Sequence, residues 1–250
     1  MKKTLLACGL ALTTAACVTP YAPVPYDREL AGVEKILIVE QSFPEEADTR
    51  KLATNGANLT SAASAAVPVA GLFVAAIAAG VEANIEANQR ARIRATLAEQ
   101  EFDGEAVFDA ALEAALTDSG YELDSVSLDR KSPGDFVQLV SDAQADEKTA
   151  ILDVAGAGYG YQLVGGSTQW RPYAAAQVRL SNPQDPETIH MDNRVMYNPV
   201  AQPDVIVTIA PDEKYAFNSI DDLEANPELA REGVTAALTE TALAVSRLLQ

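Results

Sequence analysis

Runs of alternating apolar and polar residues along the chain predict several β-strands. The first, VEKILIVE, places Ile36 and Ile38 on one face, with Val39 as a further buried candidate. The same alternation predicts strands in four later segments, which are YELDSVSLD, TAILDVAGAGYGYQLV, YAAAQVRL and TIHMDNRVMYN. Because the turn-forming cluster SNPQDPE separates the last two segments, we expect them to form a hairpin.

Helical spacing of apolar residues predicts four helices. The first begins near Pro68 and extends to about Glu99, and PGDFVQLVSDAQA is expected to form another. A third, DGEAVFDAALEAALTDSG, ends at Gly120 and has an apolar face of Val107, Phe108, Ala111, Leu112, Ala115 and Leu116. The last has Asn226 as its N-cap and Pro227 as its first residue. Its apolar stripe consists of Val234, Leu238, Val245 and Leu249.

The order of these elements predicts the fold class. A strand is followed by helices, a strand, a helix, three strands and a final helix, with a long loop expected in QSFPEEADTRKLATNGAN. The chain shows no internal repeat and no second linker. This order therefore predicts one domain over residues 33–250, of the α+β class (α/β layered), in which helices pack against a mixed β-sheet.

The predicted hairpin has an apolar face and a polar face. The apolar face comprises Ala174, Ala176, Val178 and Leu180 on one strand and Ile189, Met191, Val195 and Tyr197 on the other. The polar face comprises Gln177, Arg179, His190, Asp192 and Arg194. His190 is the only histidine, so a histidine-based catalytic centre would have to include it. The alternation instead predicts a solvent-exposed strand position for His190.

The most unusual stretch is the apolar, alanine- and glycine-rich segment of residues 67–85. It contains a row of small residues at a spacing of four, namely Gly71, Ala75, Ala79 and Ala83, which permits close helix packing and is a candidate interface. A helix that is apolar nearly all round should be buried on most sides. Three partners remain open: the domain's own sheet, another copy or partner protein, and the bilayer. After Glu82 the pattern becomes amphipathic, with Arg90, Arg92 and Arg94 expected to be exposed.

The sequence GAGYG, residues 156–160, resembles a phosphate-binding loop only superficially. Its glycine spacing does not match the dinucleotide-binding motif, and the strand continues beyond it as YGYQLV. Gly156, Gly158 and Gly160 at a spacing of two are expected to leave one strand face bare, so that another backbone can approach closely. Tyr159 and Tyr161 should then project from the opposite face.

The N-terminal residues have the layout of a secretory signal. Lys2 and Lys3 precede an apolar stretch, and the small residues Ala15 and Ala16 precede Cys17. This ending resembles the bacterial lipoprotein signal, in which the cysteine becomes the lipidated first residue. We therefore expect a signal peptide at 1–16, lipidation of Cys17, and an extended proline-rich tether at 17–32. The only other cysteine, Cys8, lies inside the signal, so Cys17 would otherwise be a single unpaired thiol.

Charge and residue types restrict the chemistry that we expect. The formal net charge of −18 disfavours nucleic-acid binding, because phosphates would be repelled. With one histidine and no cysteine left free after lipidation, the usual zinc and copper ligand sets are missing, and we expect no metal and no cofactor. Among the carboxylates, Asp221, Asp222 and Glu224 are close in sequence by chance in so acidic a chain. Ser219 followed by Asp222 predicts a helix cap rather than a calcium loop.

Several segments together resemble a family of bacterial envelope lipoproteins. These segments are VEKILIVE, GVEANIEANQRAR, ILDVAGAGYGYQL and KYAFNSIDDLEANPELAREGVTAAL, in addition to the signal that ends in cysteine. More distantly, the order of elements is similar to the N-terminal domain of TolB, to the curli secretion channel lipoprotein and to the lipoprotein activators of penicillin-binding proteins. The resemblance implies a non-enzymatic assembly or accessory role. No residue matches a known partner-binding motif, so the resemblance assigns no site.

These observations predict an exported, membrane-anchored lipoprotein that faces the periplasm, with the outer membrane as the favoured location. We expect it to act without enzymatic activity, as a binding or assembly module whose partners are the membrane, through acylated Cys17, and an unidentified envelope protein. Self-association into a homo-oligomer is a further expectation. The alternative is an accessory or subunit of an envelope secretion or transport channel, with residues 67–85 contacting membrane or a neighbouring subunit.

Overall fold

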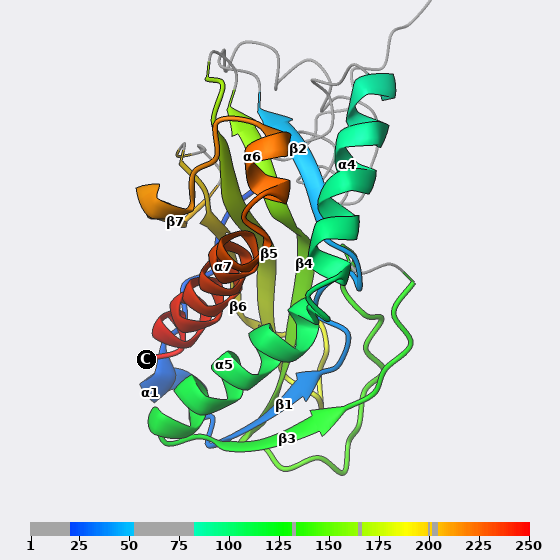
Figure 1. Cartoon of the computed structure of the whole chain (residues 1–250). Helices are drawn as coiled ribbons and strands as arrows, with labels where there is room; N and C mark the ends of the chain where they lie inside the picture. Colours follow the sequence, from blue (N-terminus) through cyan, green and yellow to red (C-terminus); the bar gives the residue numbers. More distant parts are fainter. Residues whose placement is uncertain (1–20, 53–82, 132–133, 165–166, 200, 202–204) are drawn as a thin grey trace, which may run out of the picture.

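A mixed β-sheet with helices packed on one face forms the centre of the molecule (Figure 1). The computed structural model describes residues 21–52, 83–131, 134–164, 167–199, 201 and 205–250. Within them the sheet has seven strands. The strands are β1 (Lys35–Val39), β2 (Asp48–Leu52), β3 (Glu122–Val126), β4 (Thr149–Val164), β5 (Trp170–Ser181), β6 (Ile189–Tyr197) and β7 (Val207–Ile209). The predicted α+β fold with a mixed sheet is therefore confirmed.

The long strand β4 organises the sheet. The strand order is β3-β1-β4-β5-β6-β7, and β5 is antiparallel to both of its neighbours, β4 and β6. On its other edge, β4 pairs in parallel with β1 along residues 149–152 and with β2 along residues 160–164. These two short strands therefore follow each other along one edge of a single long strand.

The helices cover one face of the sheet (Figure 1). They are α1 (Arg28–Ala31), α4 (Ala83–Ala98), α5 (Gly104–Asp118), α6 (Ile220–Glu224) and α7 (Pro227–Leu248), with a 3-10 turn at Glu213–Tyr215. Helix α7 packs against α5, β5 and β6, while α4 packs against β2 and α6. The Asp103 carboxylate accepts a hydrogen bond from the Ala106 amide and so caps α5, and Gly120 with φ of +83° follows its end.

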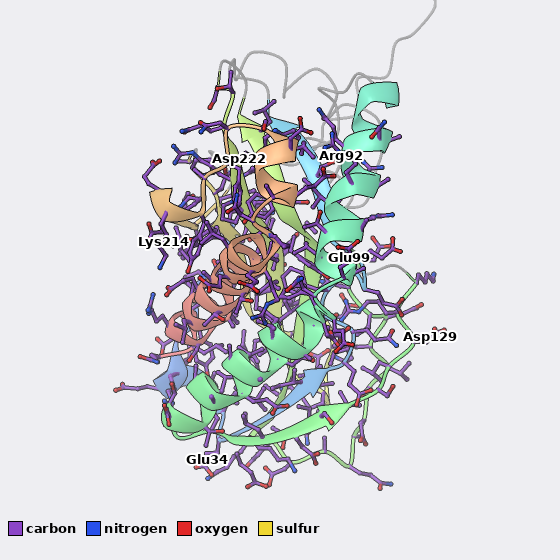
Figure 2. All side chains as sticks on the ribbon, in the orientation of Figure 1. Glu34, Arg92, Glu99, Asp129, Lys214 and Asp222 are labelled. Atoms are coloured by element: carbon purple, nitrogen blue, oxygen red, sulfur yellow. The ribbon has the colours of Figure 1, made fainter. Side chains whose placement is uncertain are left out.

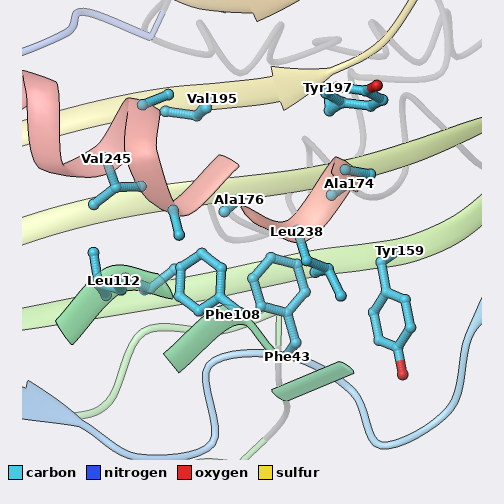
Figure 3. Packing of buried hydrophobic residues seen from close by; sticks show 14 of the residues in the cluster. Phe43, Phe108, Leu112, Tyr159, Ala174, Ala176, Val195, Tyr197, Leu238 and Val245 are labelled. Carbon is cyan, nitrogen blue, oxygen red and sulfur yellow. The ribbon is translucent and has the colours of Figure 1, made fainter. Parts of the chain in front are cut away.

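The hydrophobic core lies between the helices and β4–β6 (Figure 3). The predicted stripe of α5 is confirmed at Phe108, Leu112 and Leu116, which are fully buried. Phe108 packs against Phe43, with 4.8 Å between the ring centroids. The predicted stripe of α7 also lies in this core, as does the apolar face of the hairpin except for Ile189, which is only partly buried beside a register shift. The core residues of the two elements are Ala174, Ala176, Val178, Leu180, Met191, Val195, Tyr197, Val234, Leu238, Val245 and Leu249.

Two predicted elements are wrong. The segment 134–145, expected as a helix, is irregular. The Asp153 carboxylate accepts from the Val137 amide at 2.7 Å, and Val137 packs in a small cluster with Val39 and Ile151, so contacts to the sheet replace the helical hydrogen bonds. The predicted long loop contains β2. Its residues, DTRKL, have no apolar alternation, and they form a strand because the upper half of β4 offers a free edge.

The predicted bare glycine face is also wrong, although the close backbone approach is confirmed. The register shifts between Gly156 and Gly158, so Gly156 pairs with core residue Ala176 while Gly158 pairs with Ala175 on the other face. The approaching backbone is the β1–β2 connection, because the Gly156 amide donates to the Ser42 carbonyl at 2.7 Å. Tyr159 and Tyr161 lie in the core, on the face opposite Gly158 as expected but on the same face as Gly156.

Candidate functional site

The face of β5 and β6 opposite the helices carries a buried polar network. Sequence alternation predicted a solvent-exposed polar face here, but Gln177, Asp192 and Arg194 retain exposed fractions of 1%, 5% and 4%. One oxygen of Asp192, Oδ1, accepts from Gln177 Nε2 at 2.7 Å, and Oδ2 accepts from Arg179 Nη2 at 2.7 Å. The predicted exposure of this face is therefore wrong, and the Asp192 charge can be buried because it meets the opposite charge of Arg179 and the amide of Gln177.

The N-terminal residues of the described chain complete this network. The Tyr21 hydroxyl donates to Asp192, with 2.9 Å to the carbonyl oxygen and 3.1 Å to Oδ1. The Arg194 guanidinium lies over the Tyr21 ring, 3.8 Å from its centroid. Burial, and secondarily the Asp192 carboxylate, raises the pKa of Tyr21, so the hydroxyl remains a hydrogen-bond donor. We call these five residues, Tyr21, Gln177, Arg179, Asp192 and Arg194, the N-terminal clamp.

Backbone pairing adds to the clamp. Val24 forms an antiparallel bridge with Asp192, in which the Val24 amide donates to the Asp192 carbonyl at 2.9 Å and the Asp192 amide donates back at 3.0 Å. Pro23 and Pro25 have no amide hydrogen, and they occupy the alternate positions where an edge strand directs its amides away from the sheet. Residues 21–31 thus lie on the domain or form α1, so the extended tether predicted for 17–32 does not extend over them.

This clamp was missed at the sequence level. A usable signal was present in YAPVPY, where prolines on both sides of Val24 suit an edge strand with a single paired residue. A second signal was the opposite charge of Arg179 and Asp192 on neighbouring strands of the predicted hairpin. Neither signal identifies Tyr21 as the contact, because the pairing of Val24 with β6 joins segments more than 160 residues apart in sequence.

Charged residues on this face continue across the sheet. Asp153, Arg179 and Asp192 are cross-strand neighbours on β4, β5 and β6, so negative and positive charges alternate. Arg130 pairs with Asp153 at 2.7 Å, and both side chains are almost fully buried. Burial raises the pKa of Asp153, and the Arg130 guanidinium opposes this rise. Two contacts hold the irregular segment 134–145 on the sheet: Arg130 donates to the Asp135 carbonyl, and the Val137 amide donates to Asp153.

His190 lies on the same strand as the clamp but outside its network. It is half-buried rather than fully solvated, and burial lowers its pKa. The nearest carboxylate in sequence, Asp192, already accepts from Tyr21, Gln177 and Arg179. Asp192 is therefore committed to structural contacts and does not orient the imidazole as a triad carboxylate would.

The three arginines of α4 form a second charged group, of which Arg92 is labelled in Figure 2. Arg90 pairs with Asp48 of β2, and Arg94 pairs with Glu46 at 2.6 Å and donates to the Ala47 carbonyl. Arg92 pairs with both Asp221 and Glu224, and its Nε lies 2.7 Å from Glu224 Oε1. The hydrogen bond from Arg92 lowers the pKa of Glu224. Their side chains are about one-third to two-fifths exposed, so the predicted exposure is only partly correct. Asp221 and Glu224, which are close in sequence, therefore bind an arginine.

Acidic side chains gather along α5. Asp109 is partly buried, and its Oδ1 has no hydrogen-bond partner among the described residues. Burial, followed by the nearby Glu105, Glu113, Asp103 and Glu40, raises the pKa of Asp109 to about 7. The Glu105 carboxylate accepts from the Ser42 amide at 3.1 Å. In the described part of the chain, no three His, Cys, Asp or Glu residues could hold a metal ion.

The open hollows of the described surface include two beside the helices. One, of about 500 Å³, lies where α5 and α7 end and is lined by Arg28, Asp118, Ser119, Ser246, Arg247 and Gln250. The other, of about 210 Å³, lies between α4 and the β1–β2 connection and includes Arg94, Leu97, Phe102 and Tyr159. Ser119 Oγ already donates to the Ala115 carbonyl and accepts from Gln250. Neither hollow contains the clamp or His190.

The remaining predicted residues fall mainly outside the described residues. Cys17, Gly71, Ala75 and Ala79 lie there, and Ala83 is the first residue of α4. The predicted cap is confirmed, because Ser219 Oγ accepts from the Asp222 amide at 3.0 Å.

Within the described segments, no helix is long and apolar enough to cross a membrane. No protein-family model matches the chain, and no curated protein matches it either.

Proposed function

We propose that this chain is a lipoprotein of the bacterial cell envelope, anchored in the outer membrane by acylated Cys17 and facing the periplasm. It acts as a non-enzymatic binding or assembly module. The observation that carries the proposal is the N-terminal clamp, which fixes the chain to the domain from Tyr21 onward, only four residues after the candidate lipidation site. A rigid attachment at this point is useful to a protein that is held by its N-terminus.

The non-enzymatic part of the proposal is supported by how the buried polar groups are used. The Asp192 carboxylate accepts from Gln177 and Arg179, and the Asp153 carboxylate accepts from Arg130 and from the Val137 amide. Tyr21 stays protonated because burial raises its pKa. Carboxylates that are engaged in structural contacts do not supply the proton transfer or the nucleophile that catalysis requires.

Replacement of Cys17 tests the anchor. The Cys17→Ser chain should lose incorporation of labelled fatty acid and should leave the membrane fraction, because several acyl chains are needed for stable attachment. Cys8→Ser is the matched control, since it removes the other cysteine without touching the acylation position. Cys17→Ser protein that still carries fatty acid or still sediments with membranes would contradict the proposal.

Crosslinking in intact cells tests the binding role. The lipidated chain should give a discrete crosslinked adduct with one envelope protein, and the yield of this adduct should fall when Cys17→Ser removes the chain from the membrane. A chain that remains uncrosslinked in its own envelope would count against an assembly module.

A further inference from the structure

The clamp limits how far the domain can lie from its anchor. Only Val18, Thr19 and Pro20 separate Cys17 from Tyr21, and the Tyr21 side chain is fixed to β6. Four extended residue steps span at most about 14 Å. If Cys17 is acylated, as proposed above, its backbone must therefore lie within about 14 Å of the Tyr21 backbone. The domain cannot move freely above the membrane on so short a connection.

Tyr21 also determines which side of the domain this anchor reaches. Its hydroxyl and ring contact Asp192 and Arg194, which project from β6 on the face opposite the core. On the other face, α5 and α7 cover the sheet (Figure 1). A helix with its side chains is about 10–12 Å in diameter, and packed layers are about 10 Å apart. The outer surface of the helices is therefore beyond the reach of a 14 Å connection that starts on the opposite face.

Exposed apolar side chains provide an independent observation. In the described parts of the chain, three large hydrophobic side chains are strongly exposed: Leu30, Val140 and Ile206. Ile206 lies beside the clamp, because its amide donates to the Arg194 carbonyl at 3.1 Å. Val140 belongs to the irregular segment whose Phe136 ring lies 4.0 Å from the Arg179 guanidinium. Two of the three therefore lie at the face, or at the edge of the face, that Tyr21 occupies.

We propose that the clamp side of the domain, carrying Tyr21, Val140 and Ile206, rests against the lipid bilayer surface, while α5 and α7 face the periplasm. The opposite charges of Asp192, Arg179 and Arg130–Asp153 pair within this face, so none of these four is left as an unpaired charge beneath the lipid headgroups. Exposed Val140 and Ile206 contact the interfacial region, where apolar side chains are favourable. The helix layer is then the surface left free for a protein partner.

Fluorescence quenching by labelled lipids tests this orientation. The full acylated chain is reconstituted into vesicles of phosphatidylethanolamine and phosphatidylglycerol that contain a headgroup-nitroxide lipid. Because acylation consumes the Cys17 thiol, single cysteines can be introduced and labelled, namely Val140→Cys and Ile206→Cys on the clamp side and Glu113→Cys on α5. The nitroxide should reduce fluorescence strongly at positions 140 and 206 and little at position 113.

A lengthened connection is the matched control. Insertion of about twenty Gly and Ser residues between Thr19 and Pro20 keeps the anchor but gives it a typical span of about 25 Å. The difference in quenching between positions 206 and 113 should then shrink. Equal quenching at the three positions in the unmodified chain, or stronger quenching at 113, would overturn the orientation while leaving the anchor intact. A chain without fatty acid would instead overturn the proposed function and this inference with it.

Discussion

Replacement of Asp109 by asparagine should stabilise the protein at neutral and alkaline pH. Asp109 lies on α5, partly buried, among the carboxylates of Glu105, Glu113, Asp103 and Glu40. Burial is the main reason why its pKa rises from 3.8 to about 7. Asparagine has nearly the same shape as the protonated carboxyl, so the variant removes the charge and keeps the packing.

The magnitude follows from the two pKa values. The difference between about 7 and 3.8, at about 1.4 kcal/mol per pH unit, sets an upper bound of about 4 kcal/mol. Because the side chain is only partly buried, screening by solvent lowers this to on the order of 1–2 kcal/mol. The folded chain binds the proton more tightly than the unfolded chain. The protonated Asp109 carboxyl thus makes its full contribution to the free energy of unfolding below pH about 4, and this contribution is lost as the pH rises through about 7.

Urea denaturation of the full chain at several pH values is the assay. At pH about 8, Asp109→Asn should raise the free energy of unfolding by about 1–2 kcal/mol, and below pH about 4 the two proteins should be nearly equal. Asp129→Asn is the control, since Asp129 is exposed on a loop (Figure 2). A variant that is destabilised at pH 8, or whose effect does not change with pH, would refute the assigned cause.

Substitutions at two further positions test the sheet, at Gly160, and the non-enzymatic role, at His190. Gly160→Ala should lower the melting temperature, because Gly160 has φ of +138° and an added Cβ would lie 2.1 Å from the Asp48 carbonyl oxygen. The expected loss in the free energy of unfolding is about 1–3 kcal/mol. Gly120→Ala is the control, because Gly120 also has a positive φ but an added Cβ would meet open space, so the loss should be smaller. His190→Ala should change stability by about half a kcal/mol or less and preserve cellular function. A folded His190→Ala chain that loses function would contradict a non-enzymatic role.

Local periodicity was sufficient for the elements whose burial is one-sided. The face of α5 with Phe108, Leu112 and Leu116 and the stripe of α7 are buried where the spacing placed them. The alternation of β5 likewise identified Ala174, Ala176, Val178 and Leu180 as core residues. In each case the buried face follows from the repeat of the backbone itself, 3.6 residues for a helix and two for a strand.

The polar strand β2 and the irregular segment 134–145 could not be predicted in this way. DTRKL has no apolar face, and it becomes a strand only because the upper half of β4 presents unpaired backbone groups. Residues 134–145 have apolar residues at helical spacing, yet Asp153 on the sheet binds the Val137 amide and Arg130. In both places, a distant partner supplies the hydrogen bonds that determine the backbone conformation.

The candidate site shows the same division. The sequence by itself determined the candidate anchor at Cys17, the acidic charge of the chain and the two faces of the hairpin. Only the tertiary structure decided that the polar face is buried, because Tyr21, Gln177 and Arg179 converge on Asp192 from segments far apart in the chain. Periodicity states which side chains share a face, whereas burial depends on what else folds against that face.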